Sequence, residues 1–238
     1  SSDAGTAMGA ALAMHHMITK DRTVRPYGED LYLGPRYDID QEYISKIAKK
    51  YNAQVSKTSV SDIVDLMRTK NIVAIYQGGA ECGPRALGNR SLMFDPTFKD
   101  GKDFVNVIKR REYFRPFAGS ILHEHAQEWL DMRGLAESPH MMYAMNCKEG
   151  VAEKIPSIIH VDGTCRIQTV KEHQNPNYYA VIKEFYNQTG IPIIFNTSFN
   201  LGGEPLVETL DDALRTLANS DIEYLYLPEH EIILTVKN

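Results

Sequence analysis

Between residues 72 and 236, short apolar runs alternate with longer stretches whose apolar residues recur at helical spacing, and this alternation limits the possible folds most strongly. The apolar runs predict strands at 72–76, 91–94, 117–122, 141–146, 165–170, 191–195, 223–226 and 231–236. The helical stretches predict helices at 101–110, 124–131, 176–188 and 208–219. Because strands that alternate with helices form a sheet covered by helices, we expect an α/β fold.

The start of the chain has a different character. The stretch Ala4–Lys20 is rich in Ala and Met, and its small residues recur at a spacing that suits a helix packed closely against another element. Asp3 stands where the N-cap of this helix would fall. A chain that opens at a helix cap indicates to us that an upstream domain is missing.

The next stretch, Asp21–Arg36, holds two prolines and two glycines and is interpreted as a linker with a short strand at Leu31–Leu33. Helices are then expected at 39–51 and at 61–70, the second with Ser59 or Ser61 as its cap. Further along, Gly134–Pro139 is expected to be the most flexible loop.

Composition excludes several classes of protein. Hydrophobic residues make up 43% of the 238 residues, enough for a sizeable core, and the net charge of -5 provides no positive field to attract nucleic acid. No apolar run approaches the roughly 18 residues of a membrane span, and the first residues lack the basic start and the apolar stretch that a signal peptide has. The three widely spaced cysteines form neither a disulfide framework nor a zinc pattern. We therefore expect reduced thiols and a cytoplasmic protein without a membrane partner.

Two polar segments carry clusters of cations. The Gly-rich segment Gly78–Arg90 follows the strand at 72–76, and its Arg85 offers a planar fork for a phosphate or carboxylate. The segment Lys109–Ala118 contains four cations, which include Lys109 and Arg115, and three aromatic side chains that could stack on a base. Equally, the first could be a turn with solvated arginines, and the second a solvated charged face over core aromatics.

Two further segments place polar side chains on strands or at strand ends. Arg166 lies on the strand after the Asp-Gly-Thr turn, and a cation among apolar neighbours requires an anionic partner, either a ligand or a structural carboxylate. The strand at 191–195 runs directly into Asn196 and Ser198, which can bind phosphate or carbonyl oxygens or can form a local turn. No pair of histidines has the spacing of a metal site.

Taken together, these segments resemble one family. The motifs stand in the order 83–91, 115–118, 138–141, 160–164 and 196–200. They resemble the C-terminal part of O-carbamoyltransferases of the nodulation-protein and antibiotic-tailoring type. Residues 1–25 look like the end of the family's N-terminal domain, which is similar to the actin-like ATPase and sugar-kinase fold. Residues 26–238 resemble the family's C-terminal domain, so the chain would be the second half of a member.

The resemblance implies a fold and an activity. The fold would be YrdC-like, a twisted mixed sheet flanked by helices. The domain would use ATP with Mg²⁺ and carbamoyl phosphate to form carbamoyladenylate. The upstream kinase-like domain would then transfer the carbamoyl group to a hydroxyl of a small-molecule acceptor, at a site holding Fe²⁺ or another divalent metal. This chain would be the half of the enzyme that forms carbamoyladenylate.

The resemblance also implies residue roles. Lys109, Arg115 and Arg85 would be catalytic and would hold phosphates together with Arg166. Asn196 and Ser198 would position the adenylate, and Asp3 would be a metal ligand of the complete enzyme. We therefore expect the four cations to converge on one pocket. The alternative function is a non-catalytic module that binds a nucleotide or RNA, although the acidic composition disfavours RNA.

Overall fold

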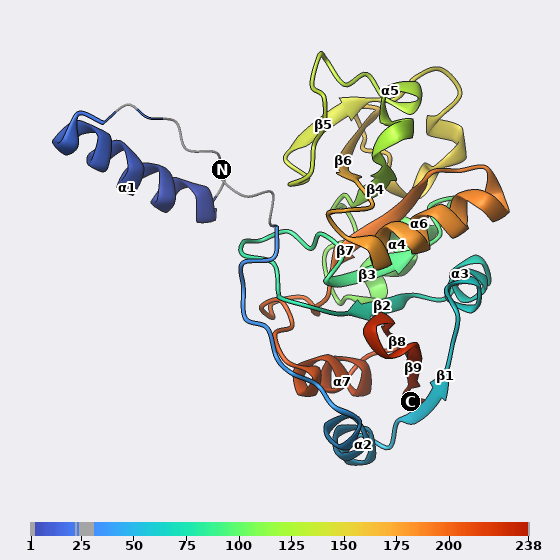
Figure 1. Cartoon of the computed structure of the whole chain (residues 1–238). Helices are drawn as coiled ribbons and strands as arrows, with labels where there is room; N and C mark the ends of the chain where they lie inside the picture. The colour runs from blue at the N-terminus through green and yellow to red at the C-terminus, as the bar shows by residue number, and fades with distance from the viewer. Residues whose placement is uncertain (1–2, 22, 24–30, 238) are drawn as a thin grey trace.

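The structure is a computed structural model that describes residues 3–21, 23 and 31–237 of the chain (Figure 1). The helices of the described part are α1 (Asp3–Thr19), α2 (Gln41–Lys50), α3 (Val60–Arg68), α4 (Gly101–Ile108), α5 (Ala126–Trp129), α6 (Pro176–Thr189) and α7 (Leu210–Ala218). The strands are β1 (Gln54–Lys57), β2 (Val73–Tyr76), β3 (Arg90–Phe94), β4 (Ala118–Leu122), β5 (Tyr143–Asn146), β6 (Thr164–Val170), β7 (Ile193–Ser198), β8 (Tyr224–Leu227) and β9 (Ile232–Thr235). Short 3₁₀ turns occupy His123–His125, Ala152–Lys154, Pro156–Ile158 and Pro228–His230.

Within the described residues, the nine strands form one mixed sheet in the order β1-β9-β8-β2-β3-β7-β4-β6-β5. The pairs β2 with β8 and β4 with β6 are parallel, and the other neighbours are antiparallel. In this order, most neighbouring strands are not consecutive in the sequence. The centre of the sheet brings β3, β7, β4 and β6 side by side. The segments that the sequence singled out for chemistry lie on these strands or next to them.

Helices cover both faces of the sheet because the strand side chains alternate between two cores. On one face, Val73 and Ile75 of β2 join the core formed with α3 and α6. On the other face, Ala74 and Tyr76 join the core formed with α2, α4, α5 and α7. Strands with apolar residues on both faces are typical of a sheet between two helical layers. The expected α/β fold with a mixed sheet flanked by helices is confirmed.

Local sequence signals set the helix boundaries. Ser59, one of the two serines that the sequence offered as a cap, is the N-cap of α3, where its side chain and that of Asp62 form a reciprocal capping box. Asn175 caps α6, and Gly190 ends it with a φ of 72°, a conformation that glycine adopts without strain.

Three expectations about elements differ from the structure. The strand expected at 31–33 is wrong: the segment is irregular, and Gly34 N–H donates to the carbonyl of Ala80 instead of joining the sheet. The strand β1 was not expected, because its short polar sequence pairs only with β9 at the edge. The helix expected at 124–131 is a 3₁₀ turn followed by the single turn of α5.

The loop 134–139 is held at its end rather than free. Ser138 is buried, its N–H donates to Thr169 Oγ1 over 2.8 Å, and its hydroxyl donates to the carbonyl of Ile167 over 3.0 Å. These bonds attach the end of the loop to β6, so the expectation of flexibility does not hold there.

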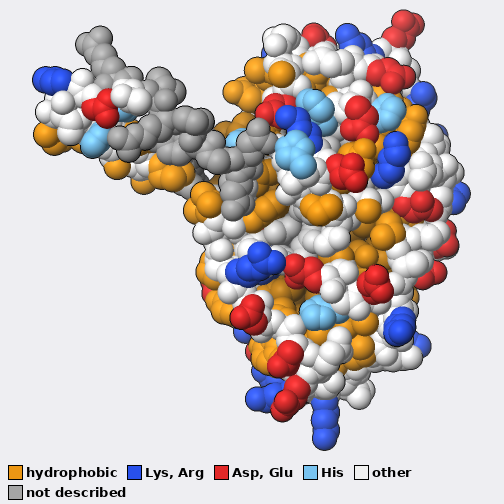
Figure 2. Space-filling view, in the orientation of Figure 1, with side chains coloured by type: hydrophobic (Ala, Val, Ile, Leu, Met, Phe, Trp, Pro, Cys, Tyr) orange, Lys and Arg blue, Asp and Glu red, His pale blue; other side chains and the backbone are white. Residues whose placement is uncertain are grey.

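The helix expected at Ala4–Lys20 is present as α1. It lies apart from the sheet in Figure 1 and exposes large apolar side chains, among them Met17 and Ile18. Figure 2 shows hydrophobic side chains on this helix, and acidic and basic side chains interspersed over the visible face of the main body. None of the helices in the described residues is long and apolar enough to cross a membrane.

Candidate functional site

The loop between β2 and β3 carries Arg85, and a buried carboxylate organises it. Glu81 Oε1 accepts the backbone N–H groups of Leu87 and Asn89 at 2.7 and 2.9 Å, and that of Arg90 at 3.2 Å. Three N–H groups directed at one oxygen hold the loop in a single conformation. The loop therefore presents Arg85 from a fixed backbone.

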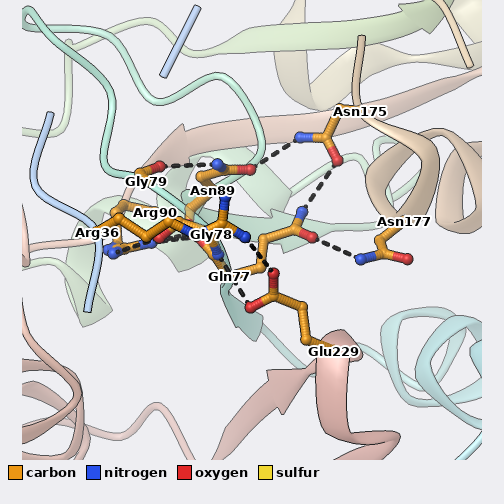
Figure 3. A network of polar contacts seen from close by, with 9 residues as sticks. All are labelled: Arg36, Gln77, Gly78, Gly79, Asn89, Arg90, Asn175, Asn177 and Glu229. Carbon is orange, nitrogen blue, oxygen red and sulfur yellow. Dashed lines mark hydrogen bonds and ion pairs between the residues drawn. The ribbon is translucent and has the colours of Figure 1, made fainter. Parts of the chain in front are cut away.

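A second network fixes the base of this loop, as Figure 3 shows. Arg90 has no exposed surface, and its guanidinium donates to the carbonyls of Gln77, Gly78 and Glu208 while it stacks on the ring of Tyr76 at 3.7 Å. Every donor direction of this guanidinium is occupied by protein. Arg90 is therefore structural.

The neighbouring amides extend this network across the loop (Figure 3). Asn89 donates to the carbonyl of Gly79 over 2.8 Å and accepts from Asn175, whose own oxygen accepts from Gln77 over 3.1 Å. The cap of α6 is thus bonded directly to the Gly-rich loop.

Two adjoining cavities open beside the loop. The larger one, which we call the outer cleft, has a volume of about 1010 Å³ and is lined by residues of the α4–β4 segment and of the loop after β7, including Lys109, Arg111 and Arg115. The smaller one, which we call the arginine cavity, has a volume of about 70 Å³ and is lined by Arg85, Arg111, Arg166, Asn196 and Ser198 among others. Pro84, Arg85, Arg111 and Ser198 line both cavities.

Three guanidinium groups meet in the arginine cavity without a carboxylate partner. Burial, followed by the nearby charges of Arg115 and Arg166, lowers the pKa of Arg111 to about 10. Burial, followed by the charge of Arg85, lowers the pKa of Arg166 to about 10. Across the described residues, none of Arg85, Arg111 and Arg166 forms an ion pair. Arg111 and Arg166 therefore remain cationic at neutral pH, and the cavity carries an uncompensated positive charge.

The same cavity has buried polar atoms without a partner. Arg85 Nε, Arg166 Nε and Asn196 Oδ1 are inaccessible to solvent and form no hydrogen bond. Buried polar groups in folded proteins are nearly always bonded, so each such atom requires an explanation. Because these atoms belong to residues that line one small cavity, an anionic ligand with a hydrogen-bond donor of its own would satisfy them together.

Lys109 is buried at the junction of α4 and the loop after β7. Its ammonium donates to the carbonyl and hydroxyl oxygens of Ser198 and, over 3.1 Å, to Asn200 Oδ1. Burial, followed by the charge of Arg111, holds the pKa of Lys109 well below its ordinary value. Lys109 thus lines the outer cleft while its donors are directed at the end of β7 and at the loop that follows it.

Arg115 lies at the rim of the outer cleft. Its Nε forms an ion pair with Glu112 Oε2 over 2.7 Å, and 52% of its side chain is exposed. The four cations expected to converge are therefore divided, with Lys109 and Arg115 at the outer cleft, Arg166 at the arginine cavity and Arg85 at both.

Sequence reasoning did not select Arg111 as a site residue, although this side chain lines both cavities. Its Nε donates to Asn106 Oδ1 over 2.6 Å, and its guanidinium lies 4.0 Å from the centre of the Phe117 ring. The sequence signal that could have selected Arg111 is its proximity to Phe117, just before a strand, because an aromatic ring can stack against a guanidinium group.

The metal ligand expected at Asp3 cannot be placed, because this side chain lies outside the described ones. Within residues 3–21, 23 and 31–237, no group of three His, Cys, Asp or Glu side chains could hold a metal ion. The described residues therefore do not fit a resident divalent metal.

Comparison with known proteins identifies the family. The family model described as carbamoyltransferase C-terminus matches residues 64–233, which contain the loop, the lining of both cavities and the strands β2 to β8. The chain belongs to this carbamoyltransferase family. The resemblance that the five motifs indicated is thereby confirmed.

Several relatives match across most of the chain. Nodulation protein NolO of Bradyrhizobium diazoefficiens is 37% identical over 94% of this chain and 41% of its own length. Nodulation protein NolNO of Sinorhizobium fredii is 35% identical over 97% of the chain and 34% of its own length. An uncharacterized protein of Methanocaldococcus jannaschii, MJ1058, is 36% identical over 94% of this chain and 38% of its own length. The chain therefore spans about two fifths of the length of these relatives.

Solved structures give a weaker likeness. A crystal structure of full-length HypF in the phosphate- and nucleotide-bound form matches 71% of this chain and 21% of its own, with a TM-score of 0.45 and 18% identity. A crystal structure of T.kodakarensis HypF matches 70% of this chain and 21% of its own, with a TM-score of 0.48 and 15% identity.

Proposed function

We propose that the two cavities bind ATP and carbamoyl phosphate and form carbamoyladenylate, from which the carbamoyl group is transferred to a hydroxyl of a small-molecule acceptor. The observation that supports this most strongly is the meeting of Arg85, Arg111 and Arg166, without a carboxylate, around one cavity. Membership of the carbamoyltransferase family supplies the class of group transferred.

The two cavities suit the two substrates in size and charge. The arginine cavity, at about 70 Å³, suits a single small charged group, whereas the outer cleft, at about 1010 Å³, has the volume of a nucleotide site. Guanidinium groups bind phosphate oxygens in a planar, bidentate manner, so Arg85 and Arg111, which line both cavities, can contact a phosphate in either. We place carbamoyl phosphate in the arginine cavity and the triphosphate in the outer cleft.

The reaction balances in two steps. Water displaces phosphate from carbamoyl phosphate, which leaves carbamate, and a carbamate oxygen then attacks the α-phosphorus of ATP while the bond to the β-phosphate breaks. One phosphate and one pyrophosphate leave for each carbamoyladenylate. The protein contributes position and positive charge rather than a covalent nucleophile. Mg²⁺, which would enter with ATP, would neutralise part of the phosphate charge.

Several roles follow for the chain's own residues. Arg166 and Arg85 hold the phosphate of the carbamoyl donor, Arg115 at the rim contacts the triphosphate, and Ser198 lies at the passage between the cavities. Lys109 holds the end of β7, where Ser198 lies beside the cleft. Transfer to the acceptor falls to the upstream kinase-like domain that the resemblance implies, with the divalent metal located there.

The proposed substrates favour a cytoplasmic location. ATP and carbamoyl phosphate are cytosolic metabolites, and Cys82, Cys147 and Cys165 are all free thiols. The surface shown in Figure 2 mixes both signs of charge, which favours a small-molecule ligand over a nucleic-acid partner.

The test is to measure phosphate and pyrophosphate release from the protein with ATP, Mg²⁺ and carbamoyl phosphate. We expect both products in equal amounts, and pyrophosphate only when both substrates are present. Asp95, which is buried away from the lining of both cavities, provides a control position through Asp95→Asn. A protein that binds ATP but releases no pyrophosphate would be a nucleotide-binding module, and the proposal would be wrong.

A further inference from the structure

The amide of Asn196 stands at the back of the arginine cavity in a hydrogen-bond network that fixes its orientation. Its Nδ2 donates to the carbonyl of Ala86 over 3.1 Å, to Ser120 Oγ over 2.9 Å and to Gln168 Oε1 over 3.3 Å. Asn196, Ser120 and Gln168 are each at most 1% exposed. Both hydrogens of the amide nitrogen are therefore used inside the protein.

Two backbone carbonyls make this orientation the favourable one. The carbonyl of Ala86 can only accept, so it requires the nitrogen of Asn196 rather than its oxygen. The carbonyl of Leu87 requires the nitrogen of Gln168, which donates to it over 2.9 Å and leaves Gln168 Oε1 facing Asn196 as an acceptor. Turning the Asn196 amide over would place its oxygen against both acceptors.

Ser120 completes the network. Its hydroxyl accepts from Tyr178 Oη over 3.0 Å and donates to Gln168 Oε1 over 2.8 Å, so toward Asn196 it also presents an acceptor. The atom that Asn196 can offer to an occupant of the cavity is thus Oδ1, which is buried and has no partner.

An acceptor oxygen among three guanidinium groups is informative about the ligand. A carboxylate, or the phosphate group of a monoester in its dianionic form, has no hydrogen to donate and would place its own oxygens against Asn196 Oδ1. A ligand that carries an N–H group beside its anionic oxygens satisfies the arginines and the amide together. Within the proposed function, on which this step rests, the carbamoyl NH₂ is that group.

We propose that Asn196 Oδ1 is the specificity determinant that accepts a hydrogen bond from the NH₂ of the carbamoyl donor, and that Ser120 and Gln168 are positioning residues that fix the amide for this purpose. The site thereby distinguishes a carbamoyl group from an acyl group of the same size.

The variant-free test compares two ligands on the wild-type protein. Acetyl phosphate replaces the NH₂ of carbamoyl phosphate with a methyl group of similar size, and affinities for both are measured by calorimetry. Because acetyl phosphate would leave a buried acceptor unpaired, we expect it to bind at least about tenfold more weakly. Equal affinities would overturn this inference and leave the proposed function standing. Binding of neither ligand would overturn both.

Variants test the roles of the individual side chains. We expect Asn196→Ala to reduce the ratio of the two affinities to about one, and Ser120→Ala to reduce it partly, since one of three acceptors of the amide is lost. Asn187→Ala, which removes an exposed amide on α6, is the matched control and retains the wild-type ratio. A purely structural role would weaken both ligands equally. An unchanged ratio in Asn196→Ala would therefore refute the specificity role, and an unchanged ratio in Ser120→Ala would refute the positioning role.

Discussion

Arg90 and Arg166 are the same residue type in opposite surroundings. The guanidinium of Arg90 is saturated by backbone carbonyls and stacked on Tyr76, whereas Arg166 has a buried Nε without a partner and another cation, Arg85, nearby. The first arrangement stabilises the fold. The second is unfavourable until an anion binds, which is the expected signature of a ligand-binding group.

Replacing Arg166 therefore separates binding from folding. In Arg166→Gln we expect affinity for carbamoyl phosphate to fall about 10- to 150-fold, the range for a lost charge-assisted hydrogen bond of about 1.5–3 kcal/mol. The free energy of unfolding without ligand is expected to stay the same or to rise, because repulsion from Arg85 is removed. Calorimetry and urea unfolding measure the two quantities. A large loss of stability with unchanged affinity would assign Arg166 to the fold.

Replacing Arg90 has the reverse effect. In Arg90→Met the carbonyls of Gln77, Gly78 and Glu208 lose their buried donor, and we expect the free energy of unfolding to fall by about 3 kcal/mol or more. The measurement is urea unfolding, with Arg68→Met, at an exposed position on α3, as the control variant. A variant as stable as the wild type would show that the network in Figure 3 contributes little.

Lys109 gives stability a dependence on pH. Burial and the charge of Arg111 lower its pKa in the folded protein, so between that lowered pKa and the ordinary value of about 10.4 the unfolded chain binds more protons. Stability from this group is lost as pH falls through the window and is recovered as pH rises. From about pH 7 to about pH 9.5, we expect the free energy of unfolding of the wild type to rise relative to that of Lys109→Met. Lys46→Met, at an exposed position, is the control, and a difference independent of pH would contradict this origin.

For single residues, the sequence predicted which side chains line the site better than it predicted the contacts that each of them makes. Arg85, Arg166, Asn196 and Ser198 line the arginine cavity, as their positions in turns, on strands and at strand ends suggested. That Lys109 would donate to the loop after β7 could not be foreseen, because this contact depends on how α4 packs against the centre of the sheet. Their proposed roles toward ATP and carbamoyl phosphate stay predictions.

Among the elements, the loop 77–89 is the one that most directly positions the site. Its conformation depends on one carboxylate oxygen of Glu81, which accepts three backbone N–H groups. A glutamine has the same shape but no charge, and it would hold these donors less strongly. We therefore expect the conformation of the loop to be sensitive to replacement of Glu81, although Glu81 lines neither cavity.

In Glu81→Gln we expect the free energy of unfolding to fall by about 1–3 kcal/mol and affinity for carbamoyl phosphate to fall several-fold, because Arg85 would be held less firmly. Hydrogen exchange of the amides of Leu87 and Asn89 reports the loosening directly. Glu149→Gln, at an exposed site, is the control. Unchanged exchange at both amides would show that other contacts hold the loop.

The elements themselves follow from the sequence where the signal is local. The capping box of α3 and the apolar run of β2 were visible in the residues. The edge strand β1 and the irregular segment 31–33 were not, because both depend on partners distant in sequence, β9 for the first and the carbonyl of Ala80 for the second. Edge pairing and loop pairing leave little trace in local hydrophobicity.

At the scale of the whole molecule, the sheet order explains why residues far apart in sequence share one site. The strands β3, β7, β4 and β6 are neighbours, so the loop before β3, the end of β7, the start of β4 and the face of β6 surround the same cavities. A family match over residues 64–233 covers this arrangement, while the relatives continue well beyond the length of this chain. The central claim is that carbamoyladenylate forms at these cavities.

The most direct measurement of that claim is a single turnover with protein in excess over ATP labelled at its α-phosphate, together with carbamoyl phosphate and Mg²⁺, followed by a quench with hydroxylamine. Carbamoyladenylate would be converted to hydroxyurea and labelled AMP. We predict one hydroxyurea for each labelled AMP, above a control without ATP, and much less of both products from Arg166→Gln at a carbamoyl phosphate concentration that does not saturate this variant. Label that remains in ATP, or AMP that forms without hydroxyurea, would contradict the account.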